Sequence, residues 1–294
     1  MKEFAGKTAV ITGAASGIGL ALAKRFSEEG MRLVLADIEE PALERARADL
    51  EKAGAGVVAK KTDVSRYEDV EALAELAYDR FGAVNLLCNN AGVGAGCALW
   101  SCTLEDWKWI LGVNLWGVIH GVKAFVPRMI EQGERGHVLN TASVAGLVSG
   151  PQLGIYSTSK FGVVALSEAL FYDLRMAGHD IGVSVLCPGF VRTRIAESER
   201  NRPPELSHSA SPKWTSSDSA RQVIAAGMDA SKVASIVVDA LREEKFYIFT
   251  HPWTHSLVKM RYESLLSERL DQLIMEAMTP DSRATHDGPG VVPL

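Results

Sequence analysis

Short apolar runs alternate with helix-patterned segments through the first 190 residues, and this alternation constrains the fold more than any other feature of the chain. Most runs are rich in Val, Ile and Leu without strict polar alternation, which is typical of strands buried on both faces. The segments between them are long enough for crossover helices. We therefore predict a parallel sheet with helices on both faces. The six predicted strands span residues 8–13, 32–37, 56–63, 85–92, 137–143 and 182–189.

Two helix starts follow from local signals between these runs. Pro41 suits the first turn of one helix, where a missing N–H costs nothing. Ser65 with Glu68 resembles a capping box at the start of another helix.

The alternation ends after Pro188. Residues 191–230 are rich in Ser, Pro and charge, whereas 231–250 and 254–278 again look ordered. An excursion this long within one domain is more often a functional lid than a linker. We predict one domain over residues 1–278, with 191–230 as a substrate lid, and a frayed tail over 279–294.

Apolar residues in and near this lid are candidates for a substrate pocket. Trp214 stands among polar neighbours, so it lines such a pocket or packs in a surface loop; the sequence favours neither. Leu153, Leu147 and the stretch 95–99 are further candidate walls.

Charge and composition exclude several classes of partner. The 294-residue chain has a net charge of −5 and no Lys/Arg-rich run, so we expect neither nucleic acid nor an anionic membrane as the main partner. We see no signal peptide and no apolar stretch of about twenty residues, so no membrane span is expected. The cysteines, Cys88, Cys97, Cys102 and Cys187, show no CxxC spacing, and a reducing cytoplasm fits best. His251 and His255 have no second ligand cluster beside them, so no metal is expected.

The stretch TGAASGIG, residues 12–19, follows the first predicted strand and opens the first predicted helix. Glycine allows a sharp turn and a close approach to phosphate, and a helix N-terminus offers free N–H groups. The spacing is GxxxGxG rather than the GxGxxG dinucleotide fingerprint. An ordinary tight turn also needs glycine, but the position after the first strand favours phosphate binding.

Asp37 ends the second predicted strand, about twenty residues further on. An acid there can accept hydrogen bonds from the adenosine ribose and repel a 2′-phosphate, and it can also cap a helix. No Arg or Lys occupies residues 38–40 or interrupts the glycine turn. We therefore favour NAD over NADP. Asp63 and Val64, which close the third strand, lie where adenine could be held.

Tyr156 precedes Lys160 by four residues, which places both on one face of a helix. A cation about 4 Å from a phenolate is worth about 4 kcal/mol at an effective dielectric of about 20, enough to lower the tyrosine pKa by up to about 3. Such a tyrosine can exchange a proton with a substrate oxygen. One such pair arises by chance in many chains, so it proves nothing alone.

Two further polar residues give the pair a context. Ser143 ends the fifth strand, at the edge where open α/β sheets bind ligands; it could hold a substrate oxygen or cap a turn. Asn114 lies in an apolar helix, where a buried amide needs partners. A structural hydrogen bond explains Asn114 as well as a catalytic role does.

In this order the motifs resemble the short-chain dehydrogenase/reductase family in its single-domain form. The matching elements are TGAASGIG (12–19), Asp37, Asp63–Val64, NNAG (89–92), Asn114, Ser143, Tyr156 with Lys160, and PGFVRT (188–193). The resemblance implies a doubly wound (Rossmann) seven-stranded parallel sheet in one α/β domain. It also implies a homotetramer or dimer built on the helices that contain residues 105–131 and 156–177, whose apolar faces include Trp109, Trp116 and Phe171.

The family's roles carry over position by position. Tyr156 would be the general acid/base, and Ser143 would orient the reacting oxygen. Lys160 would lower the tyrosine pKa and hold the nicotinamide ribose, and Asn114 would anchor a proton-relaying water. The remaining cofactor contacts would come from Gly13, Ser16, Gly17, Ile18, Gly19, Asp37, Asp63, Val64, Asn90, Ala91, Gly92, Pro188, Gly189, Val191 and Thr193.

Two departures from the family pattern stand out. Ala142 replaces a second serine found in many relatives, and the chain after residue 193 is longer than in minimal members. The runs 106–130 and 195–203 look similar to bacterial dehydrogenases of bulky secondary alcohols, including enzymes that oxidise the benzylic alcohol of lignin-derived aryl ethers. We expect an NAD-dependent enzyme that interconverts a secondary alcohol and a ketone. An NADPH-dependent carbonyl or C=C reductase and a non-catalytic dinucleotide sensor are the alternatives.

Overall fold

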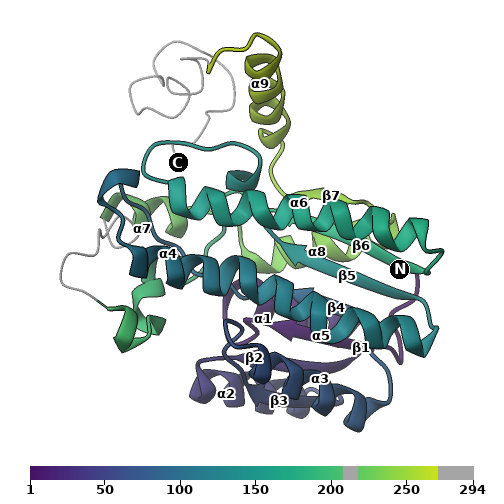
Figure 1. Ribbon diagram of the computed structural model, residues 1–294. Coiled ribbons are helices and arrows are strands. Elements are labelled where there is room, and N and C mark those ends of the chain that lie inside the picture. Colours follow the sequence, from purple (N-terminus) through teal and green to yellow (C-terminus); the bar gives the residue numbers. More distant parts are fainter. Residues whose placement is uncertain (208–217, 271–294) are drawn as a thin grey trace.

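The seven strands form one parallel sheet in the order β3-β2-β1-β4-β5-β6-β7 (Figure 1). The structure is a computed structural model that describes residues 1–207 and 218–270. The strands are β1 (Thr8–Thr12), β2 (Arg32–Asp37), β3 (Val57–Lys61), β4 (Leu86–Asn89), β5 (Gly136–Thr141), β6 (Ile181–Cys187) and β7 (Tyr247–Phe249). The predicted doubly wound sheet is confirmed, and β7 comes from the segment that resumes order after the predicted lid.

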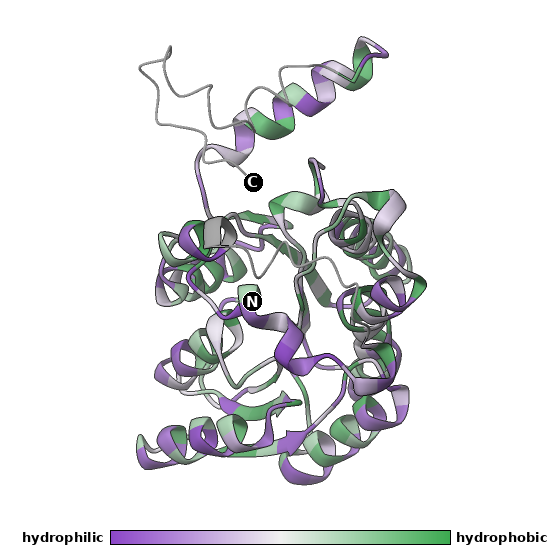
Figure 2. Cartoon of the chain, turned by 90° about the vertical axis from the view of Figure 1, so that its left-hand side faces the viewer, coloured by the Kyte–Doolittle hydropathy of each residue, from purple (hydrophilic) through white to green (hydrophobic). Residues whose placement is uncertain are grey.

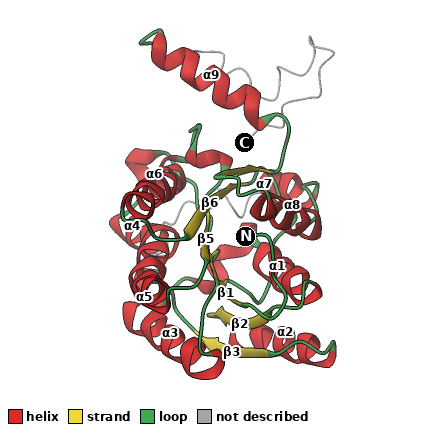
Figure 3. Ribbon diagram, turned by 90° about the vertical axis from the view of Figure 1, so that its right-hand side faces the viewer, coloured by secondary structure: helices red, strands yellow, loops and turns green. Residues whose placement is uncertain are grey.

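Helices cover both faces of the sheet (Figure 3). One face carries α1 (Gly17–Glu28), α2 (Glu40–Lys52) and α8 (Ala230–Arg242), beside α7 (Asp218–Ala225). The other carries α3 (Tyr67–Phe81), α4 (Leu104–Leu111), α5 (Gly117–Gln132) and α6 (Gly154–Met176). The last described helix, α9 (Thr254–Leu266), projects from the body of the molecule (Figure 1). The strand order reverses between β1 and β4, the position where doubly wound sheets open a ligand crevice.

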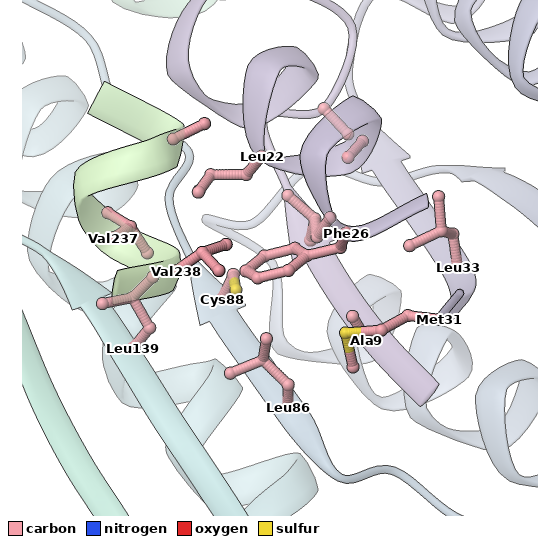
Figure 4. Close-up of a cluster of buried hydrophobic side chains, with 14 of the residues drawn as sticks. Ala9, Leu22, Phe26, Met31, Leu33, Leu86, Cys88, Leu139, Val237 and Val238 are labelled. Atoms are coloured by element: carbon pink, nitrogen blue, oxygen red, sulfur yellow. The ribbon is translucent and has the colours of Figure 1, made fainter. Parts of the chain in front are cut away.

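Figure 2 shows hydrophobic residues on the sides of the helices that face the sheet, and their buried side chains pack against both faces of the sheet. Figure 4 shows the cluster between α1, α8 and the central strands, in which Phe26 lies beside Val238 and Cys88. Cys88 and Cys187 are both fully buried, as expected of small hydrophobic residues. This packing fixes the carboxyl ends of β1, β4 and β5, from which the site is built.

The two predicted helix starts have different outcomes. Pro41 lies in the first turn of α2, as predicted. The capping box of Ser65 with Glu68 is wrong, because the Ser65 amide and hydroxyl both donate to Asp63 Oδ1 and α3 begins only at Tyr67. A capping box occurs instead at α4, where Thr103 and Asp106 bond reciprocally.

One described helical stretch, Leu104–Gln132, is long and apolar enough to cross a membrane by length and composition, which the sequence analysis did not expect. Half of its most apolar window is buried inside the protein, where α5 packs against α3 and α4 against α6. Core helices pass the same test, so this finding is weak support for a span.

Candidate active site

A cleft opens along the carboxyl ends of the strands, at the reversal point between β1 and β4. Its walls come from the glycine turn, the ends of β2, β4 and β5, the start of α6 and the segment after β6. Of the predicted site residues, those that line it are Gly13, Ser16, Gly17, Ile18, Asp37, Asp63, Val64, Asn90, Ala91, Gly92, Ser143, Leu153, Tyr156, Lys160, Pro188, Gly189, Val191 and Thr193. Gly19 and Asn114 do not line the cleft, and Trp214 and the predicted tail 279–294 lie outside the described residues.

The three glycines of the turn are required for different reasons. Gly13 and Gly17 have φ of 67° and 54°, values that favour glycine. A Cβ on Gly19 would lie 2.1 Å from the Gly13 carbonyl oxygen, so only hydrogen fits there. The helix α1 that follows has no acidic residue in its first turn, so no carboxylate competes with a phosphate for its N-terminal amides. The turn therefore fits a pyrophosphate.

Asp37 lies at the end of β2 and holds two backbone amides. Its Oδ2 accepts from Ala15 N at 2.9 Å and its Oδ1 from Glu39 N at 3.0 Å. A carboxylate has about four lone-pair sites, so two remain for ribose hydroxyls. Asp37 therefore both bonds local backbone amides and faces the cleft, which are the two roles that the sequence left open.

Tyr156 and Lys160 lie on the first turns of α6 and both line the cleft. Lys160 Nζ is 5.8 Å from the centroid of the Tyr156 ring and donates to the Thr141 carbonyl oxygen at 3.0 Å. The prediction that the pKa of Tyr156 is lowered is wrong for the chain alone. Burial raises the pKa of Tyr156 to about 12, opposed by a hydrogen bond with Ser143. Burial also lowers the pKa of Lys160 to about 8.

Ser143 connects the tyrosine to the loop after β6. Its hydroxyl accepts from Ala145 N at 3.1 Å, which caps a short helical turn, and donates to the Pro188 carbonyl oxygen at 3.4 Å. The predicted turn-capping and cleft-facing roles therefore occur in one residue.

Asn114 is fully buried behind the cleft, in the wide π-helical turn Gly112–Trp116 between α4 and α5. Its amide accepts from Val93 N at 2.8 Å and donates to Val93 O and Ser159 Oγ at 2.9 and 3.1 Å. The structural hydrogen bonds are therefore present, and a water relay remains a prediction. Such π turns are frequent at functional sites.

The segment 194–202, which we call the cleft arm, carries residues that the sequence analysis did not single out. Arg194 and Arg200 line the cleft and bond Glu39 on its opposite wall. Ser198 accepts from Gly94 N at 2.9 Å. At the end of the arm, buried Arg202 pairs with buried Asp106 of α4. The predicted lid 191–230 includes this arm, and residues 208–217 of the lid lie outside the described residues.

The cysteines differ from expectation, and one of the two histidines makes a structural contact. Cys97 and Cys102 form a disulfide across five positions, between β4 and α4, whereas the sequence suggested no pairing. His251 Nδ1 accepts from Gly189 N at 3.3 Å, which ties the segment before α9 to the loop over the cleft. Within residues 1–207 and 218–270 no group of three or more His, Cys, Asp or Glu residues could hold a metal.

The chain matches known proteins over most of its length. Residues 7–204 match the family model described as short chain dehydrogenase. A CLA biosynthesis dehydrogenase/reductase of Lactiplantibacillus plantarum is 36% identical over 91% of this chain and 96% of its own. A 1-deoxy-11-beta-hydroxypentalenate dehydrogenase of Streptomyces exfoliatus is 38% identical over 83% of each chain. The crystal structure of a short chain dehydrogenase/reductase from Burkholderia phymatum in complex with NAD is 49% identical, with a TM-score of 0.89 over 92% of this chain and 97% of that one.

Proposed function

The chain is an oxidoreductase of the short-chain dehydrogenase/reductase family, and on that premise we propose that it interconverts a secondary alcohol and a ketone with NAD as its cofactor. The observation that carries the proposal is one cleft with two ends. Tyr156, Ser143 and Lys160 line one end, and the glycine turn with Asp37 lines the other.

Three features support NAD. The glycine turn leaves no room for side chains where a pyrophosphate would approach, and Asp37 keeps unused lone pairs beside it. Residues 38–40 offer no cation. The similar Burkholderia phymatum protein was crystallised with NAD. Gly13, Gly17 and Asp37 would hold the adenosine diphosphate half, and Lys160 the nicotinamide ribose.

In the proposed oxidation the Ser143 hydroxyl holds the substrate oxygen and the Tyr156 phenolate takes its proton. A bound oxidised nicotinamide would supply the acceptor for the hydride of the carbinol carbon and a positive charge that favours the phenolate. The Lys160 ammonium acts in the same direction. One C–H and one O–H bond break while a C=O π bond forms, and reduction reverses each step.

Apolar residues support a bulky apolar or aryl substrate. Val93, Ala95, Val144 and Leu153 line the cleft beside Tyr156. The Streptomyces exfoliatus relative is named for a hydroxypentalenate substrate. The role of Trp214 in this pocket and the cytoplasmic location remain predictions.

We also propose a homo-oligomer, a tetramer or dimer, formed through α5 and α6. Trp116 at the start of α5 is 52% exposed and is available for such contact. Trp109 is buried and Phe171 packs against the core of the same chain, so these two residues serve the subunit itself.

The test is an initial-rate screen with NAD and NADP against secondary alcohols of graded bulk, including aryl and alicyclic ones. With the best substrate, Tyr156→Phe should lower kcat about 100-fold or more, with NADH affinity nearly unchanged. Tyr172→Phe is the matched control, because Tyr172 lies on the same helix, exposed and away from the cleft. A Tyr156→Phe enzyme with over a tenth of the wild-type rate would remove this residue from the proton transfer.

A further inference from the structure

An ion-pair network spans the cleft at its adenosine end. Glu39 follows Asp37 by two residues, and its amide donates to the Asp37 carboxylate at 3.0 Å. The side chain of Glu39 therefore extends from the place where the ribose is proposed to bind. Arg194, Arg200 and Asn201 approach it from the cleft arm, about 160 residues later in the chain, and all four residues line the cleft.

The Glu39 carboxylate is the centre of this network. Its Oε1 accepts from Arg200 Nε and Nη2 at 2.9 and 2.6 Å and from Asn201 Nδ2 at 3.1 Å. Its Oε2 accepts from Arg194 Nη1 at 3.3 Å. Burial raises the pKa of Glu39, but the hydrogen bonds from Arg200 and Asn201 outweigh it and hold the pKa below its usual value. The carboxylate is thus ionised at neutral pH.

Arg200 uses all three of its guanidinium nitrogens within the network. Its Nη1 donates to the carbonyl oxygens of Arg194 and Glu197 at 3.0 and 2.9 Å, while Nε and Nη2 hold Glu39. Arg194 is shared between Glu39 and Glu197. Both arginines therefore line a site for a phosphorylated ligand while their charges are matched by carboxylates of the protein.

We propose that Glu39 is a second determinant of cofactor choice, which acts by engaging Arg200 and Arg194 so that neither guanidinium is available to a 2′-phosphate. This inference rests on the proposed preference for NAD. A 2′-phosphate beside the ribose would meet the negative charges of Asp37 and Glu39, and the two arginines that line the cleft are already paired with carboxylates. An arginine can bind a phosphate through two N–H groups at once. Pairing Arg200 and Arg194 with carboxylates of the protein therefore favours NADH over NADPH.

The network also closes the cleft arm over the adenosine end. Arm and wall are joined by four hydrogen bonds to one carboxylate, and the Glu39 and Arg200 side chains are only 22% and 25% exposed. Two N–H groups of Arg200 donate to the same oxygen, Glu39 Oε1, and a partly buried, charge-assisted pair of this kind is stronger than an exposed single contact. Glu39 consequently orients the arm as well as setting the charge of the site.

The test compares dissociation constants of NADH and NADPH, measured by fluorescence titration, in the wild type, Glu39→Gln and Glu39→Gln/Arg200→Gln. Glu39→Gln removes one negative charge and frees Arg200, so the NADPH affinity relative to NADH should rise about 10-fold. The double variant should lose most of that gain. Glu44→Gln is the matched control, because Glu44 lies on α2, the helix that Glu39 precedes, and pairs with Arg47 but does not line the cleft. Thermal unfolding confirms that each variant is folded.

The outcomes separate this inference from the proposed function. A wild type that binds NADPH more tightly than NADH contradicts the NAD assignment itself. If the wild type prefers NADH but Glu39→Gln leaves the ratio unchanged, or the double variant keeps the gain, the NAD assignment survives and the role of Glu39 is wrong.

Discussion

Replacing Lys160 with methionine tests whether the ammonium supplies the acidity that Tyr156 needs. Lys160 Nζ lies 5.8 Å from the Tyr156 ring centroid, and a unit charge at about that distance from a phenolate is worth about 3 kcal/mol at an effective dielectric of about 20. That energy corresponds to a tyrosine pKa lower by about 2. Burial, opposed by the Ser143 hydrogen bond, raises the pKa of Tyr156 to about 12, so without a nearby positive charge almost no phenolate is present near neutral pH.

We expect the rising limb of the pH profile for alcohol oxidation to move upward by about 2 pH units in Lys160→Met, which lowers kcat at pH 7 about 100-fold. The pKa of Lys160 is lowered to about 8, so its charge is present below pH 8 and is lost above it. The difference from wild type should therefore be largest below pH 8 and shrink at higher pH.

The assay is kcat at saturating NAD and alcohol from pH 6 to pH 10, because Lys160 is also proposed to bind the ribose and its loss should raise the KM for NAD. Lys123→Met, on the exposed face of α5, is the control. A limb that stays in place in Lys160→Met would refute the argument and leave burial and the nicotinamide to set the tyrosine pKa.

Two other predictions concern the glycine turn and a buried histidine. Gly19→Ala places a Cβ 2.1 Å from the Gly13 carbonyl oxygen, so in titration the NADH affinity should fall more than about 10-fold, and in denaturant unfolding the free energy of unfolding should fall by about 1–3 kcal/mol. Gly56→Ala, where a Cβ meets only ordinary contacts, is the control and should change neither quantity. A Gly19→Ala protein that still binds NADH tightly would contradict the turn geometry. Burial lowers the pKa of His137 to about 3, so below pH 6.5 the unfolded chain takes up a proton before the folded chain does, and the free energy of unfolding falls by about 1.4 kcal/mol for each unit by which the pH is lowered. Between pH 6.5 and pH 5, His137→Gln should therefore lose about 2 kcal/mol less stability in urea unfolding than the wild type or the control His255→Gln. Parallel curves would disprove this.

The strands and the polar ends of the cleft could be predicted because their signals are local. Buried parallel strands require continuous apolar runs, and these runs end where Asp37 and Ser143 occur. The spacing of Tyr156 and Lys160 fixes their common helix face whatever the rest of the fold does. The order of these motifs along the chain then gave the site.

Features that depend on contacts between distant residues could not be predicted from the sequence. The direction of the Tyr156 shift depends on burial by surrounding elements, which spacing alone does not reveal. Glu39 and Arg200 are separated by 161 positions, and nothing near either residue indicates the other. Ser65 failed as a cap because Asp63, two residues earlier, takes its hydroxyl. The Cys97–Cys102 disulfide depends on how the chain folds back between β4 and α4.

The cleft arm is fastened at three places: to Glu39 beyond the second strand, through Ser198 to Gly94, and through Arg202 to Asp106 on α4. A single stretch of nine residues therefore borders both the proposed coenzyme site and the region beside Ala95 where the proposed alcohol would enter. Redesign of coenzyme use in this protein is consequently not separable from redesign of what it oxidises. Variant libraries that change residues at the coenzyme end of the cleft therefore also need to change the residues that face the substrate end.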